Sequence, residues 1–402
     1  MSSQTRALSA IFVTVMVDML SFGLVMPNLQ LTLERFGTKD WHLGLILASF
    51  SLATFISAPI AGRLSDRFGR KPVLLAGAIL NVISFVLYAR ADTVGWILAS
   101  RIFGGLGASN LSAAFAYVAD NSPPERRAQA MALIGAAFGM GFILGPVVGG
   151  QLAEYGGNRL LGEVSAVICV VNVFWILVAL PEPRGERSRE SAAVFSVSKF
   201  VQAVTNPQLG ALLLMFFAYN FAFSNMESTF FRLMFHRFGL EEGPSGRVLG
   251  FVGLVMVIMQ AAVVGRLVRR IGEVRMIRAG ILMVAPFLAI LPFVPSPAAV
   301  YLVSIPLAAG SAMYTPSVQA LISKTASKSI QGGVMGVTQG LGAMARILGP
   351  TVGNSLFGVW HPLPYVTAGV VMALPLAISW YALRPSSHLA PSAPDQSGAH
   401  GS

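Results

Sequence analysis

Four charged side chains interrupt the long apolar segments of this sequence. Asp18, Arg101, Glu227 and Arg346 each lie within a mostly apolar run. A carboxyl group that loses its hydration favours the protonated form, which is the property that a proton carrier needs. An arginine in the same surroundings keeps its charge and needs an acidic partner, an anionic ligand or a polar cavity. We therefore assign Asp18 and Glu227 as candidate proton-coupling residues, and Arg101 as a candidate functional residue.

Polar residues near Glu227 and Arg346 extend this set toward a binding surface. Asn220 lies seven residues before Glu227, and Gln339 lies seven residues before Arg346, so each pair shares one face of a helix. With Asn225 these residues form the predicted substrate-binding set: Asn220, Asn225, Gln339 and Arg346. A purely structural interpretation stays open, in which Glu227 reaches the membrane interface and Arg346 forms an ion pair with Asp18 or Glu227.

The elements that carry these residues are predicted to be membrane-spanning helices. Hydrophobic residues make up 54% of the chain and charged residues only 11%, whereas soluble domains keep about a quarter of their residues charged. Apolar runs of about 20 residues cross a bilayer as helices, because backbone groups in lipid must be paired internally. Twelve such spans are predicted, at 8–32, 42–62, 72–90, 94–118, 128–153, 162–181, 208–234, 246–266, 276–294, 298–320, 330–357 and 364–383.

The basic residues are distributed unequally between the two sides of these spans. Of the 28 lysine and arginine residues, 19 fall in loops on the side of the N-terminus and seven on the other side. Basic loops favour the cytoplasm, so both termini are predicted to be cytoplasmic. The net charge of +11 therefore needs no nucleic-acid partner. We expect a multi-pass protein of a bacterial inner (plasma) membrane that acts as a monomer.

The chain is predicted to consist of two related halves. Three short matches recur at a nearly constant offset, 35–37 with 237–239, 62–64 with 265–267 and 143–146 with 347–350. Such repeats place a substrate site between the halves near the middle of the membrane. The predicted division is an N-terminal six-helix bundle at 1–181, a cytoplasmic linker at 182–206, a C-terminal six-helix bundle at 207–384 and a disordered tail at 385–402.

The loop after the second span reads GRLSDRFGRK at 62–71. This segment resembles the loop signature of the major facilitator superfamily, and the resemblance extends over all twelve spans. It implies an all-α fold of two pseudo-symmetric six-helix bundles and a gating role for Asp66, Arg67, Arg70 and Lys71. The equivalent loop of the second half has Arg269 in place of the acid, so an aspartate latch belongs to the first half only.

Two further segments resemble motifs of drug:proton exporters in that superfamily. The fifth span carries Gly141, Gly145, Pro146 and Gly149, in an arrangement similar to the antiporter motif, and spacing of four places these glycines on one packing face. In the fourth span, Arg101 occupies the position that the family associates with proton coupling. Gly104 stands where the family usually has glutamine, and an alternative for Arg101 is that it extends to the outer interface.

The stretch around Asp18 is similar to tetracycline exporters, which have an acid at the same place. Asp120, Arg126 and Arg127 resemble the family's charge network at the inner gate, although a solvated loop would also account for them. These resemblances imply a secondary active transporter that exports a small amphiphilic molecule in exchange for protons. One alternative is an organic-anion or lipid-like solute carrier in which Arg346 binds the cargo, and another is a membrane receptor or scaffold.

Enzymatic and cofactor-dependent activities find no support in the sequence. It contains no P-loop, and its five histidines lack metal-ligand spacing. Cys169 is the single cysteine, so an intrachain disulfide is impossible. We expect a non-enzymatic protein without metal or cofactor, powered by a proton gradient.

Overall fold

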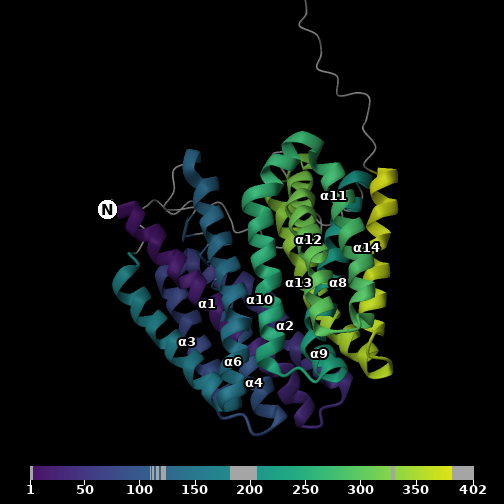
Figure 1. The fold of residues 1–402 in the computed structure, drawn as a ribbon. Helices are drawn as coiled ribbons and strands as arrows, with labels where there is room; N and C mark the ends of the chain where they lie inside the picture. Colours follow the sequence, from purple (N-terminus) through teal and green to yellow (C-terminus); the bar gives the residue numbers. More distant parts are fainter. Residues whose placement is uncertain are drawn as a thin grey trace, which may run out of the picture.

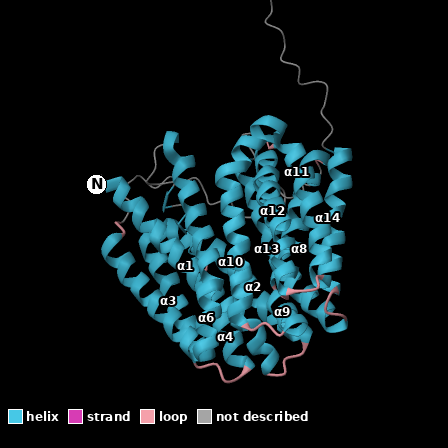
Figure 2. Ribbon diagram, in the orientation of Figure 1, coloured by secondary structure: helices cyan, strands magenta, loops and turns pink. Residues whose placement is uncertain are grey.

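The computed structural model describes residues 3–108, 110, 113–114, 117–118, 124–181, 206–326 and 331–382. Within these ranges the chain is almost entirely helical and contains no strand (Figures 1 and 2). The helices are α1 (Ser3–Arg35), α2 (Asp40–Phe68), α3 (Arg70–Ala89), α4 (Val94–Gly107), α6 (Pro124–Ala179), α8 (Pro207–Glu227), α9 (Phe230–Phe238), α10 (Glu242–Ile258), α11 (Gly265–Ile290), α12 (Pro297–Thr325), α13 (Gln331–Val359) and α14 (Leu363–Ala382). A π-helical turn, Met259–Val264, joins α10 to α11.

Eight helical stretches among the described residues are long and apolar enough to cross a bilayer. Two of them, Ile143–Ala179 and Glu242–Phe293, contain 37 and 52 residues, well beyond the length of about 20 residues that one crossing needs. Each of these two therefore supplies more than one crossing. The shorter α4 and the helix α13 complete the set of twelve predicted segments, and the all-α fold is confirmed.

Two predicted loops are almost wholly helical. The sequence predicts loops at 154–161 and 267–275, but helix continues through both and is interrupted only at Gly157 and Gly272. Both glycines have positive φ, 57° and 78°, which residues with a side chain rarely adopt. One such residue is enough to redirect the chain, so long loops are unnecessary at these two corners.

The seventh predicted span, 208–234, is divided in the structure. Helix α8 begins at Pro207, where the side chain of Asn206 accepts hydrogen bonds from the backbone N–H groups of Gln208 and Leu209. It ends at Glu227, and α9 follows after Ser228 and Thr229. The break lies directly beside the acid that the sequence singles out.

Helices α1 to α6 pack chiefly on one another, as do α8 to α14, and two helix pairs make most of the contact between the groups. These pairs are α2 with α13 and α6 with α10. The approach is close, because a Cβ atom on Gly44 of α2 would lie 2.6 Å from the carbonyl oxygen of Pro350 in α13. We refer to the end that contains the α1–α2 and α9–α10 loops as the closed end; the N-terminus of α1 lies at the opposite end (Figure 1).

Several predicted features lie outside the described residues. These are most of the linker at 182–206, the tail at 385–402 and Asp120. Asp66, Arg126 and Arg127 lie within helices, but the positions of their side chains are likewise outside the description.

Candidate functional site

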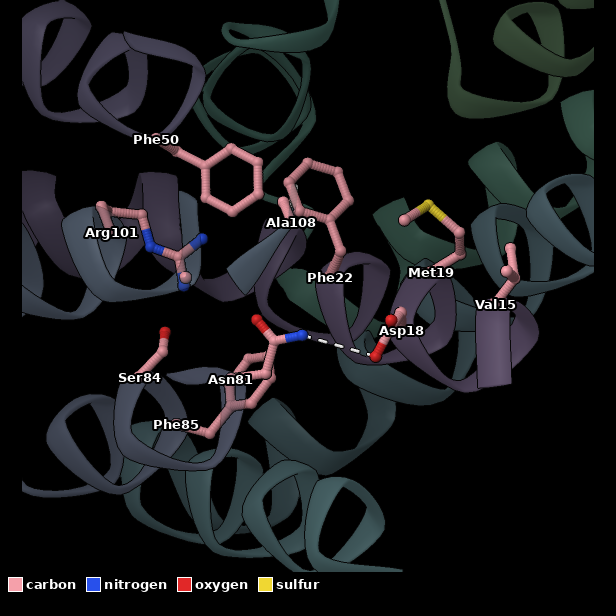
Figure 3. Close-up of a pocket in the computed structure, with 11 residues that line it drawn as sticks. Val15, Asp18, Met19, Phe22, Phe50, Asn81, Ser84, Phe85, Arg101 and Ala108 are labelled. Carbon is pink, nitrogen blue, oxygen red and sulfur yellow. Dashed lines mark hydrogen bonds between the residues drawn. The ribbon is translucent and has the colours of Figure 1, made fainter. Parts of the chain in front are cut away.

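A pocket within the first group of helices contains two of the four charged residues. It is formed by α1, α2, α3 and α4 and is partly open to solvent. Asp18 and Arg101 both line it, and Phe22 and Phe50 form an apolar wall between them (Figure 3). The structure therefore brings together two residues that are 83 positions apart in the sequence.

Among the described residues, the hydrogen-bond donors to the carboxylate of Asp18 are amide groups. It accepts hydrogen bonds from Nδ2 of Asn81 at 3.4 Å, of Asn110 at 3.4 Å and of Asn172 at 3.2 Å. No lysine, arginine or histidine in the described part of the chain lies within ion-pair distance of it. Sequence reasoning missed these three asparagines. Their only signal is that each is a carboxamide inside an apolar helix.

Arg101 is buried, with 2% of its surface exposed, so it does not extend to the membrane interface. Its guanidinium carbon lies 5.7 Å from the ring centre of Phe50 and 5.9 Å from that of Tyr88, within the range of cation–π attraction. Nη2 contacts the hydroxyl of Ser100 at 3.5 Å, while Nε has no hydrogen-bond partner. No acid of the described chain pairs with it.

The packing around position 104 favours glycine over the family's usual glutamine. A Cβ atom at this position would lie 2.8 Å from the hydroxyl oxygen of Ser84 and 3.4 Å from the ring of Phe50. A glutamine side chain would therefore require the side chain of Ser84 to shift. Ser84 and Ser100 supply the polar groups nearest to Arg101 instead.

The glycines of the fifth span bring α6 into close contact with the helix that carries Asp18. A Cβ atom on Gly141 would lie 2.6 Å from the backbone nitrogen of Leu20, and one on Gly145 would lie 2.5 Å from Cα of Gly23. Gly149 packs in the same way on the carbonyl of Leu24. The carbonyl of Pro146 packs on Gly246 of α10, so α6 contacts both groups of helices.

In the second group of helices, Glu227 and Arg346 form no ion pair with any described residue. Glu227 is half-buried, and Arg346 and Gln339 are exposed on α13. Asn220 is half-buried and donates to the carbonyl of Phe216 at 2.8 Å, within its own helix. Asn225 is fully buried and packs on Gly353, between α8 and α13. Four of these residues are thus at least partly accessible, namely Glu227, Arg346, Gln339 and Asn220. Asn225 is enclosed.

A cluster of ionisable residues at the closed end joins the two groups of helices. Arg232 of α9 is 5% exposed and pairs with Glu34 of α1 at 3.1 Å and with Asp40 of α2. It also donates to Asn354 at 3.1 Å, and His236 pairs with Glu34. Sequence reasoning missed this cluster. Its members flank short loops, where charged residues are common, and only the folded chain brings them together.

The predicted gating residues at the other end of α2 have local partners. Arg70 donates to the hydroxyl of Ser65 at 3.1 Å, and Lys71 donates to the carbonyl of Leu177 at 2.8 Å. The guanidinium carbon of Arg67 lies 5.2 Å from the ring centre of Phe68. These contacts link the end of α2 and the start of α3 to the end of α6.

These features define a class of protein. Many apolar helices in two groups, with ionisable side chains enclosed near their middle, are the architecture of a secondary transporter. The sequence matches the family model described as Major Facilitator Superfamily over residues 11–350 and 261–400. The chain belongs to the major facilitator superfamily, and it is a transporter rather than an enzyme.

Relatives of the chain include transporters of different kinds. Major facilitator superfamily domain-containing protein 10 of Mus musculus is 28% identical, with 96% of this chain and 94% of the relative covered. The class C tetracycline resistance protein of Escherichia coli is 30% identical, with 91% and 94% covered. The crystal structure of the human organic anion transporter MFSD10 is similar at a TM-score of 0.72, with 25% identity and 94% and 100% coverage.

Proposed function

We propose that this transporter exports a small amphiphilic molecule in exchange for protons, by alternating access of the two groups of helices. The single observation that carries the proposal is that the carboxylate of Asp18 is hydrogen-bonded to three neutral amides and has no basic partner in the described chain. An ionised carboxylate without a cation is costly in a membrane interior. Either a proton or a cationic group of the cargo removes that cost, so the two compete for one site.

Because protons and cargo compete for Asp18, they are exchanged in opposite directions rather than transported together. When Asp18 takes a proton, its attraction for a positively charged cargo group is lost, and the cargo is released. Glu227 serves as the second proton site on α8, and Arg101, which lines the same pocket as Asp18, tunes the exchange. The proton gradient alone supplies the energy, without a cofactor. The tetracycline resistance relative agrees with export of this kind.

The orientation follows from the basic loops. With both termini in the cytoplasm, the closed end faces the outside and the opposite end faces the cytoplasm. We place the chain, as a monomer, in a bacterial inner membrane. The cluster around Arg232 then holds the outer side shut, and the segment from Asp66 to Lys71 serves the inner side.

One observation favours a second candidate function, the transport of an organic anion. Arg346 is exposed and has no ion pair among the described residues, so its guanidinium is available to a carboxylate or phosphate of the cargo. The similarity to the human organic anion transporter MFSD10 agrees with this candidate. In this case, Arg346 and Gln339 would bind the anionic group of the cargo.

The test is proton release from the purified protein in detergent on addition of a panel of amphiphilic cations and anions. Under the first proposal, a compound releases protons from the wild type, and Asp18→Asn or Glu227→Gln abolishes the release. Glu163→Gln is the matched control, because Glu163 lies in an exposed pair with Arg159 and should leave the release unchanged. Binding of anions without proton release, lost in Arg346→Ala, would replace exchange by the anion carrier.

A further inference from the structure

A row of buried polar residues leads from the closed end of the first group of helices toward Asp18. At its outer end, the side chain of Asn158 is partly accessible and accepts hydrogen bonds from Nδ2 of Asn28 at 2.6 Å and from the hydroxyl of Thr32 at 2.7 Å. The hydroxyl of Thr32 also lies 3.0 Å from Oδ1 of Asn28, so its single proton is shared between Asn28 and Asn158. Asn28 and Thr32 are almost fully buried in α1, so this cluster enters the interior of the bundle.

Tyr88 continues the row inward. Its side chain is fully buried, and its hydroxyl lies close to Thr32 and Asn28, but the oxygen has no partner with hydrogen-bond geometry. Its ring contacts Arg101, whose Nε is also buried without a partner. An unsatisfied polar atom in a buried site costs about 1–3 kcal/mol. Two such atoms in adjacent side chains indicate a position where bridging water would be stabilised.

From Arg101 the row reaches Asp18 through two serines and one asparagine. Arg101 contacts the hydroxyl of Ser100 at 3.5 Å, and this hydroxyl lies 3.3 Å from that of Ser84. Asn81 lies one helical turn before Ser84 on α3 and donates a hydrogen bond to Asp18. Figure 3 shows Asn81 between Asp18 and the pair formed by Ser84 and Arg101.

We propose that this row is the route by which protons reach Asp18 from the closed end, separate from the path that the cargo takes between the two groups of helices. The inference rests on the proposed role of Asp18 as a proton carrier. Each hydroxyl or bridging water accepts one proton on its oxygen as it passes its own proton onward. The amides of Asn28, Asn81 and Asn158 only orient these groups, and a water in the pocket lined by Ser84, Asn81 and Asp18 makes the last transfer. Asp18 gains one proton and the solution at the closed end loses one, so no further reactant is required.

Arg101 gives this route its selectivity. A fixed positive charge in the middle of the row repels sodium and potassium ions, as arginines do in narrow membrane pores. It also opposes a free flow of protons, except when an ionised Asp18 attracts them from the inner side of the row. Protons therefore enter only when Asp18 is ready to receive one, and leakage across the membrane is avoided.

The experiment uses dicyclohexylcarbodiimide, an apolar reagent that modifies protonated carboxyl groups inside membranes. Right-side-out membrane vesicles are made acidic outside and alkaline inside, and labelling of Asp18 is measured by mass spectrometry of its peptide. Under this gradient the protonation of Asp18 reports which side supplies its protons. Vesicles acidic on both sides give the reference level, and Asp18→Asn gives the background.

The variants are Thr32→Val and Tyr88→Phe, which keep the shape of each side chain and remove its hydroxyl. With acid outside only, we expect labelling in each variant to fall about tenfold below the wild type. With acid on both sides, the variants should label as the wild type does, which controls for folding. Thr367→Val, the same change on α14, should label normally in both conditions because its hydroxyl bonds only to its own helix.

Two results would overturn the inference, and only the second would also overturn the proposed function. Wild-type labelling by both Thr32→Val and Tyr88→Phe with acid outside only would exclude this route and leave the proposed function intact. Labelling of the wild type at background level with acid on both sides would show that Asp18 takes no proton, and the proposed function would fail with it.

Discussion

Replacement of Arg232 by methionine should open the closed end of the transporter. Arg232 is the only basic residue of the described chain that pairs with both Glu34 and Asp40, and its side chain is 6% exposed. Methionine has a similar length and no charge, so the variant leaves Asp40 without its cation and Glu34 with His236 alone, while much of the packing on Phe357 is kept. The perturbation is therefore chiefly electrostatic.

The size of the effect follows from the burial of the three groups. Removal of one partner from a fully buried pair costs about 3–5 kcal/mol. The carboxylates of Glu34 and Asp40 retain 27% and 35% exposure, so solvent screens part of this loss. About 2 kcal/mol remains, which corresponds to a roughly 30-fold larger population of molecules open at this end.

The assay is the rate of maleimide labelling at Leu31→Cys, in a chain whose single cysteine is replaced by serine. Leu31 is 3% exposed and packs in a core cluster otherwise made of residues from the second group of helices, so it becomes accessible only when the groups separate. Labelling should be roughly 30-fold faster in Arg232→Met. Arg159→Met removes an exposed ion pair and should leave the rate unchanged. Equal rates in Arg232→Met and the parent would refute the role of this cluster as a latch.

Two further predictions concern helix packing and the effect of acid on the closed end. Gly145→Ala should lower the stability by about 1–3 kcal/mol, measured by thermal unfolding, because the new Cβ meets Cα of Gly23; Gly265→Ala, with open space around it, is the control, and equal losses would contradict the close-packing account. Burial and the neighbouring His236 and Arg232 lower the pKa of His361, a loop residue stacked on Phe357 and also facing Glu34 and Asp40. The closed end therefore favours the neutral form of His361. The stability that His361 contributes to the closed end is lost as the pH falls below the normal histidine pKa of about 6.5. Labelling at Leu31→Cys should accelerate in acid, and His361→Phe should reduce that acceleration; an unchanged response in His361→Phe would exclude this residue as its cause.

The sequence predicts the fold well because its signals are local. Each apolar run is long enough to define a helix by itself, and the loop at 62–71 and the glycines of the fifth span carry recognisable patterns. The predictions that differ from the structure concern the junctions between helices. A single glycine with positive φ, Gly157 or Gly272, replaces a predicted loop, and hydropathy does not distinguish the two. The break between α8 and α9 was missed for the same reason, since the run stays apolar across it.

The candidate site is only partly visible in the sequence. Asp18 and Arg101 are conspicuous because a charge in an apolar run is costly wherever it lies. The asparagines around Asp18 and the partners of Arg232 come from segments that are distant in the chain, and amides or loop charges are unremarkable one at a time. The enclosure of Asn225 against Gly353 likewise depends on how α8 meets α13, which no spacing along one helix reveals.

The central claim is that cargo and protons move in opposite directions through one protein. The direct test is purified protein in liposomes, with a pH-sensitive dye inside and a compound from the proton-release panel outside. We predict that the compound moves one way while protons move the other, and that Asp18→Asn abolishes both fluxes under a pH gradient. Movement of the compound without any proton flux, or unchanged coupling in Asp18→Asn, would contradict the account.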